Sequence, residues 1–227
     1  MVSSIYKKTF SVLMKRPFRL WGISLLAEFL CLVAYAGFIG VPAAAFCAAL
    51  LLSASMSMIF LNSYRTGLEP KTSYLFASFK KDRILRVLGG MAWMQLWIFL
   101  WSLIPIVGIV FGIIRMYEYR FVPYILMTRD DVKPTDAIKI SKQETMGYKG
   151  KMFGADILLG AVYLGVFLVF TLLGEIPYLG VLFRILWVLI AIAYGLLAPL
   201  FSGIMHAAFY VEIQNRRAAG SWHPAAP

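Results

Sequence analysis

Long runs of apolar residues alternate with short polar segments along most of the chain. A helix needs about 20 apolar residues to cross a bilayer core of roughly 30 Å. The pattern predicts an all-α polytopic membrane bundle with six transmembrane helices, over residues 19–40, 41–64, 84–103, 106–127, 152–173 and 179–206. Turns are expected at 40–42, 105–108 and 174–177, where proline and glycine interrupt the apolar runs.

Two shorter helices are expected outside these spans. Residues 5–15 predict an amphipathic helix lying on the membrane surface, with lysines opposite an apolar sector made of Tyr6, Phe10, Leu13 and Met14. Residues 134–148 predict a short cytoplasmic helix between spans four and five, because proline is tolerated in the first turn and Asp136 suits the positive helix end. We expect this second helix to dock against the bundle.

Composition and charge support a membrane location. The 227 residues are 61% hydrophobic with a mean hydropathy of +0.77, well above a soluble domain. The formal charge of +11 comes from lysines and arginines that flank apolar spans instead of forming a basic face, so we expect no nucleic-acid partner. Most of them fall in four segments on one side of the predicted topology, which places both termini in the cytoplasm and fits the inner membrane of a bacterium.

The basic N-terminal segment predicts contact with anionic lipid headgroups. Its positive residues are Lys7, Lys8, Lys15, Arg16 and Arg19. The first apolar run begins only after them and is longer than the apolar part of a cleavable signal, so we expect the first helix to remain in the mature protein.

Several short motifs recur in an order and spacing typical of one bacterial family. They are Phe76 to Phe79, Pro123-Tyr124-Ile125-Leu126, Ala137 to Ser141, Gly150-Lys151-Met152-Phe153 and Phe209-Tyr210. Through them the chain resembles the six-helix membrane proteins catalogued as domain of unknown function nine hundred and seventy-five, roughly over residues 75–213. The resemblance implies the fold and a membrane location, but no activity.

Charged residues inside apolar spans are the best functional candidates, because each costs about 2.5 to 3.5 kcal/mol to insert and usually faces a partner or an aqueous cavity. They form the candidate intramembrane polar site: Glu28, Arg115, Glu118, Arg120 and Asp156. Counting the helical rise along each span predicts two pairs at matching depths, Glu28 with Arg115 and Arg120 with Asp156, and Glu118 can join the first. These charges either fix helix register or line an anion pocket; a cavity at the arginines would favour the pocket.

No catalytic, metal or cofactor site is predicted. The chain has no nucleophile elbow, zinc-protease motif or glycine-rich phosphate loop. Its histidines, His206 and His223, have no ligands at metal spacing, and Cys31 and Cys47 lie inside apolar runs where we expect no disulfide.

Besides an enzyme that acts on lipid through Asp156 or Glu118, which no catalytic motif supports, two functions remain open from the sequence. The first is a non-enzymatic membrane protein that acts through lipids or through a protein partner on its cytoplasmic face. The second is a small transporter, channel or lipid-moving protein that uses the charges of span four. The sequence leaves the oligomeric state open.

Overall fold

The computed structural model describes residues 1–15, 17–37, 42–67, 70–105, 108–176 and 178–220. Within these ranges the chain is all-α, with nine α-helices and one 3-10 helix, η1 (Thr72–Phe79). Five helices are long and apolar enough to cross a membrane, which indicates a multi-pass membrane protein. They are α2 (Pro17–Gly37), α3 (Pro42–Thr66), α4 (Ile84–Ser102), α8 (Lys149–Leu173) and α9 (Gly180–Ala218).

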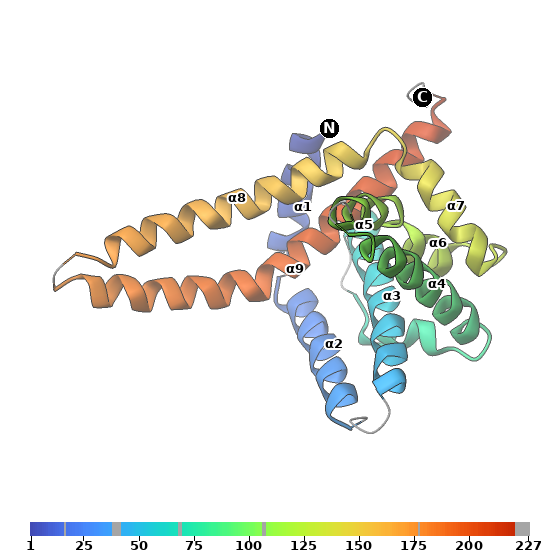
Figure 1. The fold of residues 1–227 in the computed structure, drawn as a ribbon, viewed down its shortest axis with the longest axis horizontal. Coiled ribbons are helices and arrows are strands. Elements are labelled where there is room, and N and C mark those ends of the chain that lie inside the picture. The colour runs from blue at the N-terminus through green and yellow to red at the C-terminus, as the bar shows by residue number, and fades with distance from the viewer. Residues whose placement is uncertain (16, 38–41, 68–69, 106–107, 177, 221–227) are drawn as a thin grey trace.

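Four of the five long helices form two hairpins that leave the body of the molecule in different directions (Figure 1). In one, α8 lies along the first half of α9, and in the other α2 lies along α3. Aromatic rings join the first hairpin, including Tyr163 stacked on Tyr194 with centroids 4.1 Å apart and Phe167 edge-on to Trp187 at 5.2 Å. None of the residues in the most apolar stretch of α8 or α9 is buried, as expected for helices that face lipid.

The second half of α9 belongs to the protein core. A helix of 39 residues is about 58 Å long, nearly twice the bilayer core. From Leu200 to Ile213 most of its side chains are buried against other helices. At Gly203, an added Cβ would lie 2.3 Å from the ring of Phe60, so only glycine permits this close approach of α3 and α9.

The prediction of a continuous fourth span over 106–127 is wrong. The segment forms two short helices, α5 (Gly108–Glu118) and α6 (Val122–Thr128), separated by a turn at residues 119–121. Pro123 has no N–H to donate to the carbonyl of Tyr119, and this favours an interruption of the helix here. The predicted turn at 105–108 lies partly outside the described residues, as do those at 40–42 and 174–177.

The short helix α7 (Pro134–Thr145) closes the gap in the backbone hydrogen bonding. Its Ser141 Oγ accepts a hydrogen bond of 3.2 Å from the N–H of Phe121 and donates one of 2.7 Å to the carbonyl of Glu118. Thr145 Oγ1 also donates to that carbonyl, at 3.3 Å. The predicted helix at 134–148 is confirmed as α7, which ends at Thr145, and its docking is confirmed against α4 and α6. The hydrogen bonds from α7 satisfy the backbone groups at the break between α5 and α6.

The N-terminal helix α1 (Val2–Lys15) packs mainly against α9. Its buried positions are Ile5, Thr9 and Leu13, whereas Phe10 and Met14 are exposed. The helix is present as predicted. Of the side chains expected to face lipid, Phe10 and Met14 are exposed, whereas Leu13 is buried against the bundle; contact of the helix with lipid remains a prediction.

Candidate functional site

Four polar side chains meet where α5 ends near α8 and α9. This polar cluster consists of Tyr117, Arg120, Asp156 and His206. Arg120 Nη2 lies 3.3 Å from Asp156 Oδ2 and 2.9 Å from His206 Nε2. Asp156 also accepts a 2.7 Å hydrogen bond from the Tyr117 hydroxyl. The predicted pairing of Arg120 with Asp156 is therefore confirmed, and sequence reasoning missed His206, which it considered only as a metal ligand.

The Nε2 atom of His206 cannot form hydrogen bonds with both of its neighbours at once. His206 Nε2 lies 3.0 Å from Asp156 Oδ1 and 2.9 Å from Arg120 Nη2. A neutral ring nitrogen either donates to the carboxylate or accepts from the guanidinium. The hydrogen bond to Arg120 is therefore in competition with that to Asp156, and a ligand that occupied Arg120 would leave the bond between His206 and Asp156 intact.

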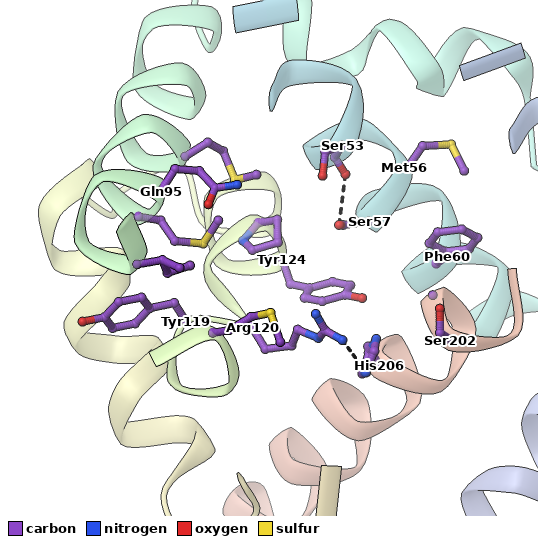
Figure 2. Close-up of a pocket in the computed structure, with 16 residues that line it drawn as sticks. Ser53, Met56, Ser57, Phe60, Gln95, Tyr119, Arg120, Tyr124, Ser202 and His206 are labelled. Carbon is purple, nitrogen blue, oxygen red and sulfur yellow. Dashed lines mark hydrogen bonds between the residues drawn. The ribbon is translucent and has the colours of Figure 1, made fainter. Parts of the chain in front are cut away.

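The cluster lies at the edge of a partly open cavity of about 420 Å³, the central cavity (Figure 2). Its walls come from α3, α4, α5 and α6 with the break between them, and α9. Ser53, Ser57 and Gln95 contribute polar groups, while Arg120 and His206 reach it from the cluster. The rest of the wall is mainly apolar and includes four methionines, Met56, Met91, Met94 and Met116, whose flexible thioethers adapt to ligands of different shape.

Two nitrogens of the Arg120 guanidinium, which lines this cavity, have no hydrogen-bond partner among the described residues. Its Nε is buried without a partner, and within the described part of the chain both hydrogen bonds of the guanidinium use Nη2, which leaves Nη1 without one. A guanidinium provides five N–H donors in a fixed plane that matches a carboxylate or phosphate. The Gln95 amide also makes no hydrogen bond with the described residues, so the cavity presents unused donors on two sides.

The other predicted arginine belongs to a different group, the buried triad of Arg115, Glu118 and Lys149. Glu118 is 4% exposed, pairs with Arg115 on its own helix, and accepts a 2.6 Å hydrogen bond from Lys149 Nζ on α8. The Arg115 guanidinium also lies over the ring of Trp101, 4.4 Å from its centroid. The triad fastens α5 to α8, and Arg115 is not among the residues that line the central cavity.

The predicted pair of Glu28 with Arg115 is wrong. Glu28 is exposed on α2, which packs against α3 and α9, whereas α5 packs against α4, α7 and α8. Matching depths along straight spans gave the correct pair for Arg120 but did not distinguish which helices are neighbours. Lys149 is not among the predicted site residues, because it precedes the predicted start of span five at 152.

The basic N-terminal residues lie apart from the cavity. Lys7, Lys8 and Arg19 are exposed, and the Lys8 ammonium lies 4.4 Å from the ring centroid of Tyr64. Arg16 and the side chain of Lys15 lie outside the described residues. Their contact with anionic lipid remains a prediction.

Metal-ligating residues do not gather in the part of the chain that the structure describes, where no group of three His, Cys, Asp or Glu side chains could hold an ion. His223 lies outside that part. Cys31 and Cys47 are free.

Comparison with models of known families, with curated proteins and with solved structures finds no match to this chain. The central cavity and the polar cluster therefore have to be interpreted from their own chemistry.

Proposed function

We propose that this protein is a non-enzymatic membrane protein that binds an oxyanion, a carboxylate or a phosphate, in the central cavity. The observation that carries the proposal is the position of Arg120, whose guanidinium lines the cavity with Nε and Nη1 unpaired. A partly buried cation in surroundings of low polarity gains more from a second anionic partner than it would in water. The Gln95 amide offers a further donor across the cavity.

The neighbouring residues favour binding over hydrolysis. Ser202 lies one helical turn before His206, and His206 is hydrogen-bonded to Asp156. This order of residues suggests a serine nucleophile with a histidine base. However, Ser202 Oγ donates to the carbonyl of Pro199 at 3.1 Å, and the His206 nitrogen that is hydrogen-bonded is directed to Asp156 and Arg120. A catalytic hydroxyl lies within hydrogen-bond reach of its base, and no such bond joins Ser202 to His206 among the described contacts, which favours binding as their role.

Thermal unfolding of the purified protein in detergent tests the proposal. Inorganic phosphate and glycerol 3-phosphate are expected to raise Tm, since a ligand at 100 times its Kd stabilises the folded state by about 2.7 kcal/mol. Arg120→Gln should remove the effect. Arg184→Gln is the matched control, because Arg184 is exposed and its partner is the exposed Glu175 at 3.7 Å. An equal rise in Tm for Arg120→Gln and the wild type would refute the proposal.

A carrier of the same anion is the second candidate, and the break between α5 and α6 favours it. Interrupted helices beside a binding site are a feature of transporters, in which the two parts can move separately. Release of trapped phosphate or glycerol phosphate from vesicles that contain the protein would distinguish a carrier from a protein that only binds.

We propose the inner membrane of a bacterium as the location, with both termini in the cytoplasm and the lysines of α1 on anionic lipid. This topology requires α5 and α6 together to return the chain through the membrane. Labelling of single cysteines at Ser4 and Ala218 from one side of intact cells tests it. The resemblance to the six-helix family, and a protein partner on the cytoplasmic face, also remain proposals.

A further inference from the structure

A second hollow, between α3 and α4, shares Gln95 with the central cavity. This side hollow, of about 460 Å³, is lined by Phe46 from α3 and by Ala92, Leu96 and Phe99 from α4, with Gln95 as its polar residue. Gln95 also lines the central cavity. The cavity that holds the Arg120 guanidinium and the apolar side hollow therefore share the Gln95 side chain.

We infer that the anion of the central cavity is the headgroup of a lipid whose acyl chain lies in the side hollow. The inference rests on the proposed function and specifies its ligand. Arg120 supplies the charge that complements a phosphate or carboxylate, and Gln95 lies where head and chain join. Phe46 precedes Ser53 by seven residues, about 10 Å along α3, so the chain would run from the cavity toward the N-terminal end of that helix.

Both compartments are bordered by α3 and α4, which favours a lipid over a free metabolite. Both helices are candidate membrane spans, and the side hollow is bordered by Phe46, Leu96 and Phe99, which are 44%, 44% and 58% exposed. Such a surface is already in contact with lipid chains in a bilayer. A chain that moves from bulk lipid into the hollow gains little hydrophobic free energy, because both environments are apolar. We therefore expect van der Waals packing in the hollow, not transfer out of water, to select the chain and to add to the affinity that Arg120 provides.

Two ligands with the same head separate this inference from the proposed function. Phosphatidic acid carries acyl chains and glycerol 3-phosphate does not, and binding of each is measured on the purified protein in detergent. We expect phosphatidic acid to bind at least tenfold more tightly, since its acyl chain makes packing contacts with the side hollow that glycerol 3-phosphate lacks.

Substitutions then assign each compartment. Ala92→Trp, which fills the side hollow, should weaken phosphatidic acid about tenfold and leave glycerol 3-phosphate unchanged. Leu100→Trp is the matched control on the exposed side of the same helix, 44% exposed and outside the hollow, and should change neither. Arg120→Gln should weaken both ligands. If Ala92→Trp leaves both affinities unchanged, the lipid inference fails while the anion site stands; if Arg120→Gln also leaves them unchanged, the proposed function fails too.

A measurement on the unmodified protein covers the case in which Ala92→Trp does not fold. Phosphatidic acid with a photoreactive diazirine in its acyl chain is bound in nanodiscs, irradiated, and the labelled peptides are identified. The inference requires labelling at Phe46 and over 92–99 that excess unlabelled phosphatidic acid suppresses. Labelling spread over α8 and α9, and insensitive to competition, would mean bulk lipid contact only and would overturn it.

Discussion

The hydroxyl of Ser141 donates a hydrogen bond of 2.7 Å to the backbone carbonyl of Glu118, and the same oxygen accepts one from the N–H of Phe121 at 3.2 Å. One buried side chain from α7 thus replaces the helical hydrogen bonds lost between α5 and α6. The position of Arg120 depends on it, because Arg120 lies between those two backbone groups.

Ser141→Ala is therefore expected to destabilise the protein by about 1–3 kcal/mol, since it leaves the buried N–H of Phe121 unpaired. Thr145 still donates to the Glu118 carbonyl at 3.3 Å, so part of the interaction survives. Denaturant unfolding in mixed micelles measures the change. The control is Ser11→Ala, which removes an exposed hydroxyl that donates to the Lys8 carbonyl in its own helix. Its free energy of unfolding should change by less than about 0.5 kcal/mol, as is usual for surface substitutions. Equal losses for the two variants would contradict the role given to Ser141.

The spans could be predicted because the necessary information is local. Length and apolar composition determine whether a helix suits a bilayer, and five of the six predicted spans correspond to long helices of the structure. The break in span four is not local in this sense. Pro123 alone is compatible with a continued, kinked helix, and the break becomes stable only through Ser141 and Thr145 of α7.

For the candidate site, the depth of each charge along its span could be predicted, but not which helices are neighbours. Depth along a span places Arg120 level with Asp156, and the structure brings them together. Depth says nothing about which helices are adjacent, so Glu28 was paired with a residue on a helix that packs elsewhere. His206 follows from neither rule: its place beside Arg120 depends on the second half of α9 entering the core, which apolar composition alone does not reveal.

Removing the charge of Glu118 tests the buried triad. Glu118→Gln leaves Arg115 and Lys149 without their carboxylate, and we expect a loss of about 2–4 kcal/mol, slightly less than for a fully buried pair because Lys149 is 32% exposed. Lys149→Gln should cost about 1 kcal/mol, and the double variant less than the sum of the two. Glu175→Gln, in an exposed pair, is the control with little expected change. Additive losses would show that Glu118 and Lys149 do not interact energetically.

Docking of α1 should weaken in alkaline solution. Tyr6 donates to the carbonyl of Ala155 at 2.5 Å, and burial, with smaller contributions from Asp156 and Tyr194, raises the pKa of its hydroxyl above the usual 10.0. A pKa that is higher in the folded state gives stability that is complete below about pH 10 and is lost as the pH rises toward the folded value. Tyr6→Phe should cost about 1 kcal/mol at pH 7 and show a smaller fall in Tm between about pH 9 and 11.

The control for this pH series is Tyr35→Phe, which changes an exposed tyrosine on α2 that is 52% exposed. It should follow the wild-type curve. A Tyr6→Phe curve parallel to the wild type at every pH would show that ionisation of Tyr6 has no part in the alkaline loss.

Neutralising Asp156 gives a result that distinguishes a binding site from a purely structural ion pair. In Asp156→Asn the guanidinium of Arg120 loses its anionic partner, so the protein without ligand should become less stable. The same change removes a negative charge close to the bound anion, and at an effective dielectric constant of 20 to 40 this favours binding by about 1–2 kcal/mol, or about five- to thirtyfold in Kd. Phosphate titrations followed by Tm measure both effects on one sample. Asp130→Asn is the control, because Asp130 pairs with Arg83 and Arg86 away from the cavity. Weaker phosphate binding in Asp156→Asn would mean that the carboxylate holds Arg120 in its binding position instead of competing for it.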